Sequence, residues 1–321
     1  MFVLRMKTVI LLLGFLLIFS RCKNTIPDTE ITIDIKDGMA TTAIARLLKD
    51  NKIIDSKTVF IVWVKLKGYE KSLNVGRYKF SENMPFNQII KLMKQANAGV
   101  VKILIPEGFS SFEIAEKLEQ AGFGKKEKYL EIINNQKLEG YLFPDTYFFN
   151  HKMTEQQILD EMRRNFDAKF NPIFDEAVLK RALQLGKSEI IILASLIEKE
   201  AKLDVERPMI SSVIYNRLKK GQYLQLCATV EYVYQMKFGN RKSRLFFQDL
   251  KIKSPYNTYR QKGLPIGPIC SPGLASLKAA IYPADTKYYF YVKNKNNDGS
   301  HIFSKEFNEH IRAKKGIKTK L

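Results

Sequence analysis

The sequence predicts an α+β protein that begins with a membrane anchor or export signal, continues with βα units and ends in a largely helical half. Three observations carry this prediction. A short apolar run, preceded by basic residues, extends from Val9 to Phe19. A pattern of alternating apolar residues, an acidic-Gly turn and helical apolar spacing occurs twice, at residues 31–48 and 101–118. A nearly unbroken apolar stretch from Ile190 to Ile197 has the character of a buried helix.

The composition is that of a globular chain with a strongly basic surface. Hydrophobic residues make up 45% of the 321 residues and charged residues 27%, which excludes a mainly disordered, a collagen-like or a multi-span membrane protein. At roughly 150 residues per domain, the length predicts two or three domains. The formal net charge of +20 attracts polyanions such as nucleic acid, an anionic membrane or an acidic wall polymer. The 3 cysteines exclude a disulfide-built scaffold and a four-cysteine zinc site.

The N-terminal run decides the compartment that we expect. Basic residues precede it and a polar stretch follows it, as in an export signal or a membrane anchor. The run is shorter than the roughly 20 residues of a full span, so a tilted span, a cleaved signal and a lipid anchor on Cys22 stay open. Arg21 argues against lipidation, because processing prefers a small residue there. We expect a retained anchor over residues 1–25 with the rest of the chain exported, which weakens the nucleic-acid hypothesis.

Each copy of the repeat predicts a strand, a turn and a helix. The alternating apolar residues have the period of a half-buried strand, and the pairs Asp37-Gly38 and Glu107-Gly108 follow them. Apolar residues at helical spacing come next, and Ser111 occupies the position of a helix N-cap in the second copy. Two ordinary βα elements without a ligand explain this repeat as well as wall-binding modules do.

The remaining segments predict further elements in chain order. A strand is expected over residues 75–80 and a helix over residues 86–93. The aromatic, Pro-centred segment 139–147 predicts an ordered junction rather than a flexible linker. From Thr154 onward the sequence turns helical, because Thr154 begins a helix N-terminal signature.

The helix expected up to Glu200 carries the best candidate for acid catalysis. Ser188 is its candidate N-cap, and Glu198 and Glu200 lie at its end. At about 100° per residue the two carboxyls lie about 200° apart, so they do not form a facing pair. Glu200 falls within the apolar arc, whereas Glu198 falls nearer its edge. A carboxyl among apolar groups has a raised pKa, which suits a general acid. The alternative is that both glutamates are solvated and simply end the helix.

Further candidate residues lie downstream. Asn216-Arg217 interrupts an apolar helical pattern, which a structural Arg–Glu pair explains as well as substrate contact does. The turn-dense segment 254–268 combines aromatic faces with amide and hydroxyl groups, which suits a sugar ring or a purely structural loop. The histidines are too scattered for a helical metal pair and no nucleotide-binding glycine motif is complete, so no metal or cofactor is expected. Outside the cytoplasm, Cys227 and Cys270 form either a disulfide or two buried free thiols.

Seven short motifs occur in a fixed order along the chain. They are Ile105-Pro106-Glu107-Gly108, Gly140-Tyr141-Leu142-Phe143-Pro144-Asp145-Thr146-Tyr147, Ala194-Ser195-Leu196-Ile197-Glu198-Lys199-Glu200, Asn216-Arg217-Leu218, Tyr256-Asn257-Thr258-Tyr259, Gly263-Leu264-Pro265 and Ser271-Pro272-Gly273, followed by His301, Phe303 and His310. Together they resemble the endolytic murein transglycosylase (YceG-like) family over essentially the whole chain after the anchor. One departure is that many members carry Thr-Asp-Pro-Thr-Val where this chain has Leu226-Cys227-Ala228-Thr229-Val230, so no role of that Asp carries over.

The resemblance implies a membrane-anchored lyase that cuts glycan strands of nascent peptidoglycan internally and so ends their elongation. The family's catalytic glutamate corresponds to Glu200, with Glu198 as a second candidate acid. The implied cleavage of the β-1,4 bond between N-acetylmuramic acid and N-acetylglucosamine is non-hydrolytic and leaves a 1,6-anhydro end. The candidate glycan-binding residues are Asn216, Gln225, Thr229, Tyr256, Asn257, Thr258 and Tyr259.

We therefore expect four parts: an anchor over 1–25, an α+β subdomain with the first repeat over 26–98, a LysM-like wall-binding subdomain over 99–150, and a mixed α/β catalytic domain over 151–321 whose buried helix carries the acid. The expected location is the cell (inner) membrane, with the catalytic domain on the extracytoplasmic or periplasmic side. The expected partners are peptidoglycan glycan strands and an anionic membrane, with peptidoglycan synthases as a further candidate and no nucleic acid. The alternative function is a non-catalytic, membrane-anchored peptidoglycan-binding protein.

Overall fold

The computed structural model describes residues 30–318 except positions 37, 75, 96–99, 243 and 297. The chain divides into two compact units, Met1–Val100 and Val101–Leu321. The anchor predicted for residues 1–25 lies outside the described residues. Within the part of the chain that is described, no helix has the length and apolar character that crossing a membrane requires.

The first unit packs helices on a two-stranded sheet. Its strands are antiparallel, with Ile33 opposite Tyr78 and Ile31 opposite Phe80. Alternate residues of both strands and the apolar faces of the helices share one core, as the sequence pattern predicts. The elements of this unit are β1 (Glu30–Ile35), α2 (Thr41–Asp50), α3 (Lys57–Leu66), the 3₁₀ turn η1 (Glu70–Ser72), β2 (Gly76–Ser81) and α4 (Phe86–Gln95).

Both copies of the repeat fold as strand, turn and helix, as the sequence predicts. The glycine of each turn, Gly38 or Gly108, has φ of +76°, in the left-handed region that favours glycine. The N-cap of the second helix is Ser110 and not Ser111, because Ser110 Oγ accepts a hydrogen bond from the Glu113 N–H at 3.4 Å. Glu113 in turn accepts from the Ser110 N–H at 2.7 Å, which completes a capping box. The predicted N-cap is therefore one residue too late, because Ser110 and Ser111 are adjacent and both are suitable N-cap residues.

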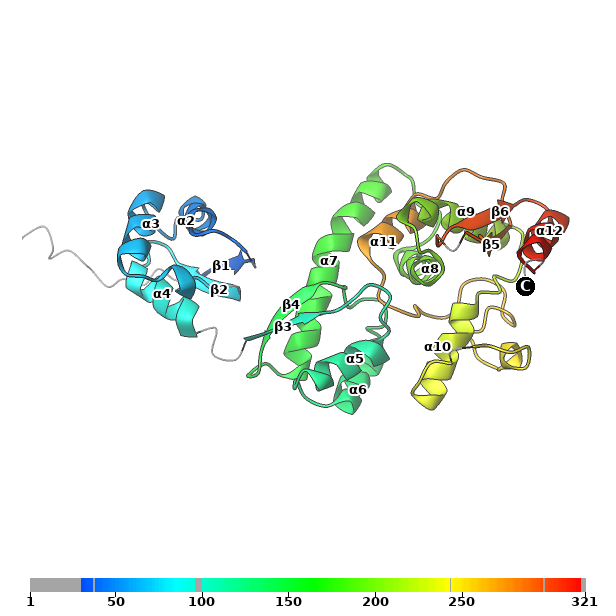
Figure 1. Cartoon of the computed structure of the whole chain (residues 1–321), viewed down its shortest axis with the longest axis horizontal. Coiled ribbons are helices and arrows are strands. Elements are labelled where there is room, and N and C mark those ends of the chain that lie inside the picture. The colour runs from blue at the N-terminus through cyan, green and yellow to red at the C-terminus, as the bar shows by residue number, and fades with distance from the viewer. Residues whose placement is uncertain are drawn as a thin grey trace, which may run out of the picture. The chain divides into compact units, whose positions relative to one another are not determined.

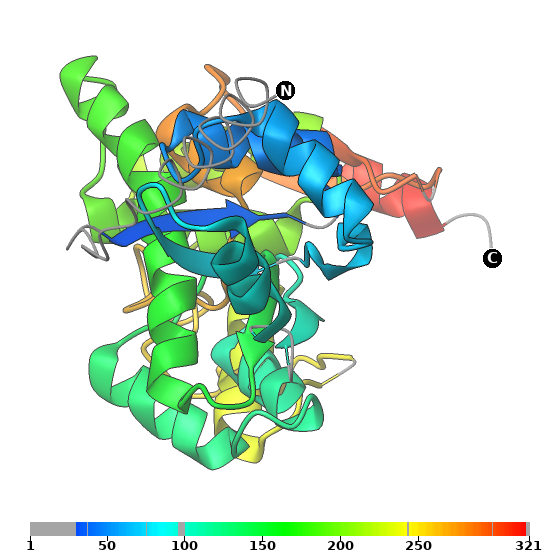
Figure 2. The ribbon, with the colours of Figure 1, turned by 90° about the vertical axis from the view of Figure 1, so that its left-hand side faces the viewer.

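The second unit is organised along α7, a long helix that appears in green in Figure 1 and, turned by 90°, in Figure 2. The predicted N-terminus of this helix is confirmed, because Thr154 and Gln157 form a capping box. The first half of α7 packs with β3, β4, α5 and α6, and the second half packs with α8 to α11. The remaining elements are β3 (Val100–Leu104), α5 (Ser111–Gln120), α6 (Lys126–Gln136), β4 (Thr146–Asn150), α7 (Glu155–Leu179), α8 (Lys187–Glu200), η2 (Asp204–Glu206), α9 (Arg207–Lys219), α10 (Cys227–Phe238), η3 (Asp249–Lys251), α11 (Leu274–Ile281), β5 (Phe290–Lys293), β6 (His301–Ser304) and α12 (Phe307–Lys318).

The helix α8 is buried in the second unit. Every residue from Ile190 to Ile197 is buried, which confirms the helix that the apolar stretch predicts. Its N-cap is Gly186 and not Ser188, because the Glu189 carboxylate accepts a hydrogen bond from the Gly186 N–H at 2.8 Å. Helices α9, α10 and α11 all pack against α8. Its last turn therefore brings two carboxyls to the end of a buried helix.

The turn of the second repeat is fixed to other parts of the same unit. The Gly108 N–H donates to the Ser271 carbonyl at 2.9 Å, and the Ser271 N–H donates to the Phe109 carbonyl at 2.8 Å. Lys199 Nζ, on α8, donates to the Gly108 carbonyl at 3.1 Å. The LysM-like role of residues 99–150 stays a prediction, and these contacts show that the turn also serves the packing of α8.

Two glycines test this packing, because both have a left-handed backbone. Gly140 has φ of +82°, and a Cβ there would lie 2.5 Å from Pro268 Cβ; Gly221 has φ of +61° and open space around it. We expect Gly221→Ala to cost about 1 kcal/mol of unfolding free energy through backbone strain alone. Gly140→Ala adds overpacking against a rigid ring and is expected to cost about 3 kcal/mol. Urea denaturation of both variants measures the difference, and equal losses would contradict this account.

Candidate active site

Glu200 ends α8 with a partly buried side chain that accepts a hydrogen bond from another element. The hydroxyl of Tyr291, on β5, donates to Glu200 Oε2 at 3.0 Å. Burial raises the pKa of Glu200 and the negative charge of Glu231 raises it further, against the opposing effects of the Tyr291 hydrogen bond and of positive charge at His301 and Lys293. The carboxyl therefore keeps its proton to a higher pH than an ordinary glutamate does.

The β5–β6 hairpin, which lies near α9 in Figure 1, delivers Tyr291 to this position. Glu206 anchors the hairpin, because it accepts from the His301 N–H at 2.8 Å and contacts His301 Nδ1 at 2.7 Å. The Tyr291 ring packs edge-on against the His301 ring, with centroids 5.4 Å apart. The hydroxyl that faces Glu200 is thus held by a hairpin with its own buried anchor.

Arg217 ties α9 to the same hairpin. Its Nε donates to the Tyr289 carbonyl at 2.7 Å and its Nη1 donates to the Leu224 carbonyl at 2.6 Å, while the guanidinium lies 5.4 Å from the Phe290 ring centroid. Burial lowers the pKa of Arg217, and the nearby Tyr291 and Glu200 oppose that effect. Arginine stays charged in proteins, so Arg217 places a fixed positive charge near Glu200.

Glu198 has a different environment from Glu200. Its Oε1 lies 3.2 Å from Arg207 Nη1, and the two side chains are only 6% and 7% exposed. Its Oε2 accepts from the Gly273 N–H at 2.9 Å. The sequence places Glu198 nearer the edge of the apolar arc, and in the structure Arg207 covers this side of α8, so the carboxylate is not solvated. Both Glu198 oxygens have partners within the fold, which suits a structural carboxylate.

Among the predicted glycan-binding residues, Gln225, Tyr256 and Tyr259 reach the surface. Gln225 is exposed and adopts a left-handed φ of +53°, with its N–H bonded to the Thr258 carbonyl at 3.1 Å. The Tyr259 hydroxyl lies 3.1 Å from Cys227 Sγ. Burial raises the pKa of Tyr259, and the contact with Cys227 and the charge of Glu200 add to that effect. Tyr259 and Cys227 therefore belong to the surroundings of Glu200.

The other predicted residues bond within the fold. Asn216 Nδ2 donates to the Thr286 and Tyr288 carbonyls, both at 2.9 Å, so it holds the segment before β5. Asn257 is fully buried, and its amide donates to the Leu250 and Ile252 carbonyls at 3.0 and 2.8 Å. The hydroxyls of Thr229 and Thr258, both buried, lie 3.0 Å apart. Asn257, Thr258 and Thr229 therefore shape the loop over 252–260 and the start of α10, whereas Asn216 acts on the segment before β5.

The two cysteines are free thiols, so the structure does not form the disulfide that the sequence left open. Cys270 is buried and its Sγ donates to the Ser195 carbonyl at 3.3 Å. Cys227 is exposed at the start of α10, whereas the other alternative expected both thiols to be buried.

The sequence patterns missed two residues beside Glu200. Tyr291 follows Glu200 by 91 positions, and nothing in its strand sequence points to that partner. Glu231 does leave a signal, because it is a single acid within the apolar run of α10, one helical turn after Cys227. No pattern search for paired carboxylates on one helix finds it, since Glu200 lies on another helix.

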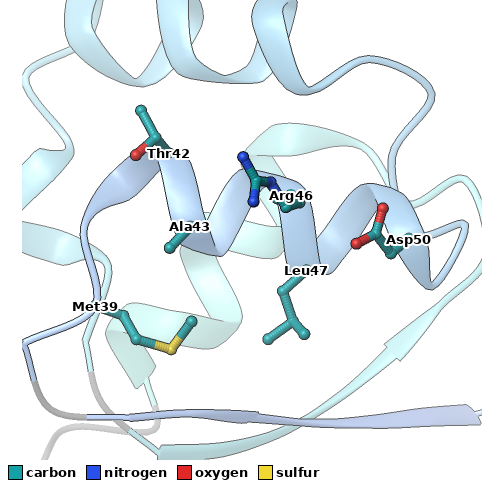
Figure 3. Close-up of a pocket in the computed structure, with 6 residues that line it drawn as sticks. All are labelled: Met39, Thr42, Ala43, Arg46, Leu47 and Asp50. Carbon is teal, nitrogen blue, oxygen red and sulfur yellow. The ribbon is translucent and has the colours of Figure 1, made fainter.

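A hollow on α2 is the alternative site in the first unit. Figure 3 shows its lining, in which Arg46 and Asp50 are the charged side chains and both are exposed. It therefore lacks a titratable group held among apolar neighbours, which distinguishes Glu200. Across the described residues, no group of three or more His, Cys, Asp or Glu side chains is placed to hold a metal ion.

Comparison with known proteins gives consistent matches over most of the chain. The sequence model of the YceG-like family matches residues 33–316. An endolytic murein transglycosylase of Bacillus subtilis (strain 168) is 34% identical over 313 residues, which cover 89% of this chain and 84% of that protein. An endolytic murein transglycosylase of Streptococcus pneumoniae serotype 2 is 26% identical over 88% of this chain and 59% of its own length. The crystal structure of a YceG-like protein from Listeria monocytogenes superposes with a TM-score of 0.58 at 32% identity, covering 89% of this chain and 99% of that one.

The two glutamates at the end of α8 predict opposite effects of the same substitution on stability. The raised pKa of Glu200 means that the folded state binds its proton more tightly than the unfolded state does. Stability from this group is therefore full in acid and is lost as the pH rises above the unfolded pKa, so Glu200→Gln should raise the melting temperature at neutral pH. Glu198→Gln removes one partner of a buried ion pair and should cost about 3 kcal/mol. Thermal unfolding between acid and neutral pH checks both effects. A lower melting temperature of Glu200→Gln at neutral pH would refute the first.

Proposed function

The chain belongs to the YceG-like family, and from this membership and the state of Glu200 we propose that it is a lytic transglycosylase that cuts peptidoglycan glycan strands. The single observation that carries the proposal is the partly buried Glu200 carboxyl, whose pKa is raised. A general acid must hold its proton near the working pH and lie where it can deliver that proton. The names of the relatives from Bacillus subtilis and Streptococcus pneumoniae support the reaction class and the murein substrate.

In this proposal Glu200 acts first as an acid and then as a base. The protonated carboxyl donates its proton to the oxygen that bridges N-acetylmuramic acid and N-acetylglucosamine, and the bond between that oxygen and muramyl C1 breaks. The muramyl C6 hydroxyl then bonds to C1 and gives its proton to the Glu200 carboxylate, which restores the acid. No water enters the reaction, and the product carries a 1,6-anhydro end. The attack comes from within one sugar, so it gains from proximity.

The neighbours of Glu200 fit both states of this cycle. After proton transfer the Glu200 carboxylate is negative, and the Tyr291 hydroxyl stabilises it through the hydrogen bond at 3.0 Å. The charge of Glu231 favours the protonated acid before the reaction, and it also favours positive charge that develops on the sugar ring. A single residue that serves as acid and then base removes the need for a second catalytic carboxylate, which hydrolytic glycosidases require.

The accessible members of the predicted glycan-binding set are the proposed glycan contacts, and Tyr259 is the one whose pKa the charge of Glu200 affects. Gln225, Tyr256 and Tyr259 reach the surface and combine an amide with two aromatic faces, a mixture that suits a sugar with an apolar face and a fringe of hydroxyls. The buried Asn257 and Thr258 are proposed to position these contacts instead of touching the glycan. Their hydrogen bonds to backbone groups hold the loop that carries the two tyrosines.

The finer features of the proposal rest on the sequence. We propose that cleavage is endolytic, acts on nascent strands and ends their elongation. The N-terminal apolar run supports a membrane-anchored protein whose catalytic part is extracytoplasmic, and the repeat supports a LysM-like wall-binding segment. The basic net charge of +20 supports contact with an anionic membrane. Peptidoglycan synthases are a further proposed partner.

Glu200→Gln tests the proposed acid directly. It keeps the size of the side chain but has no proton of suitable acidity, so release of 1,6-anhydro muropeptides should fall by roughly 10²- to 10⁴-fold. Mass spectrometry of the products from purified glycan strands provides the measurement. Glu189→Gln, at the other end of α8, is the matched control and should retain activity. Equal product from wild type and Glu200→Gln would rule out this acid, and no product from wild type would favour the non-catalytic binding protein.

Tyr291→Phe tests the hydrogen bond that stabilises the ionised form of Glu200. This bond lowers the pKa of the carboxyl, so its removal raises that pKa further. Activity requires the protonated acid and falls as the pH rises through its pKa. The alkaline limb of the pH–rate profile should therefore move to higher pH in Tyr291→Phe. Tyr282→Phe, at an exposed tyrosine after α11, should leave the limb in place. An unmoved or acid-shifted limb in Tyr291→Phe would contradict the proposed role of this bond.

A further inference from the structure

Four exposed apolar side chains lie within 12 residues of one another in the sequence, at the end of α10 and in the loop that follows it. Phe247 is 88% exposed, Phe238 62%, Phe246 56% and Met236 46%. We call these four residues, together with the Lys and Arg residues of the same segment, the Phe247 surface. The cations are Lys237, Arg241, Lys242, Arg244, Lys251 and Lys253. A single exposed apolar residue is ordinary, but three phenyl rings and a methionine within one short segment indicate a partner.

The Phe247 surface carries an excess of positive charge, although Lys242 pairs with Asp249 at 2.7 Å and Arg241 lies 3.8 Å from Glu113. Residues 236–253 contain six Lys and Arg residues and one acid, Asp249. Arg244 lies over the Phe246 ring at 5.4 Å, and the Lys242 ammonium lies 5.3 Å from the same ring centroid. Lys237, Lys251 and Lys253 are exposed. Cations are therefore placed next to apolar rings on the outside of the protein.

The one acid is buried beneath this surface and organises it. Asp249 accepts hydrogen bonds from Lys242 Nζ and from the Phe246 N–H, both at 2.7 Å, and from the Tyr234 hydroxyl. The Lys242 and Phe246 N–H hydrogen bonds lower the pKa of Asp249 to about 2, so it stays ionised. It thereby fixes the backbone at Phe246, next to Phe247, while its own charge is turned inward.

We propose that the Phe247 surface docks on an anionic lipid membrane, with Phe246 and Phe247 entering the interface and the surrounding cations contacting lipid headgroups. Apolar rings beside Lys and Arg are the combination that interfacial segments use. A glycan platform fits less well. Phenyl rings offer no hydrogen bond to sugar hydroxyls, and a side chain that is 88% exposed projects outward instead of lining a cleft.

The helix α10 connects this surface to the candidate active site. It begins at Cys227, beside Tyr259, and ends at Phe238 in the Phe247 surface. Its 12 residues span about 18 Å at 1.5 Å each. If the proposed function holds, docking places cleavage within about one such helix length of the lipid, where new glycan strands would be met. The docking itself shares no residue with the proposed acid and is tested without it.

The test uses the full chain, reconstituted into vesicles that carry acyl chains with bromine. Bromine quenches a tryptophan that enters the bilayer, so the variant Phe247→Trp reports on docking, with wild type giving the background of Trp63. Leu179→Trp is the matched control, because Leu179 is 84% exposed at the end of α7 beside Lys180 and Arg181, but no exposed phenyl ring accompanies it within residues 170–185, all of which the structure describes. An N-terminal tether acts on both variants alike, so it produces no difference between them.

We expect roughly threefold stronger quenching at 247 than at 179 in vesicles that contain phosphatidylglycerol, and little at either position in phosphatidylcholine alone. Adding Lys251→Glu and Lys253→Glu to Phe247→Trp should abolish the difference. Equal quenching at the two positions would overturn the proposal, as would a tryptophan signal at position 247 that responds to soluble glycan strands and not to lipid. Adding Glu200→Gln should leave the quenching unchanged, which separates failure of docking from failure of the proposed function.

Discussion

The burial of α8 on all sides is the constraint on which the second unit depends. A helix that is apolar from Ile190 to Ile197 has no face to offer to water, so α9, α10 and α11 must enclose it. The enclosure also covers its last turn, where the chain places Glu198 and Glu200. Two carboxyls therefore enter a poorly solvated region as a consequence of packing, and each needs a solution to the cost of burial.

The fold gives the two carboxyls different solutions. Glu198 receives Arg207 and the Gly273 N–H, so its charge is compensated and it joins α8, α9 and the start of α11. Glu200 receives one neutral donor, Tyr291, and the repulsion of Glu231, against which the positive charges at His301 and Lys293 act without an ion pair to the carboxyl among the described residues. An incompletely compensated carboxyl lowers stability, and a fold retains such a defect most readily where the chemistry uses it. The contrast between neighbours on one helix thus identifies Glu200 more strongly than its raised pKa does alone.

The sequence predicts helices and strands well where a local pattern determines them. It predicts side-chain environments less well, because residues far away in the sequence determine them. The repeat, α7 with its Thr154 cap, and the buried α8 all follow from periodicity and capping chemistry. The caps at Ser110 and Gly186 were displaced because Glu113 and Glu189, one helical turn on, select the cap residue. The helical wheel does not predict the burial of Glu198, because it contains no Arg207. Tyr291 was missed because a contact across 91 residues leaves no spacing to detect.

The same limit applies to charge. A net charge of +20 says that the surface attracts anions but not where. Around Phe247, Asp249 is turned inward onto Lys242 and the Phe246 N–H, so it compensates Lys242 while Arg244, Lys251 and Lys253 stay exposed at the surface. The rings at 246 and 247 are held outward by those same bonds. Apolar exposure and positive charge at this surface therefore have a common structural cause, and neither is a simple consequence of composition.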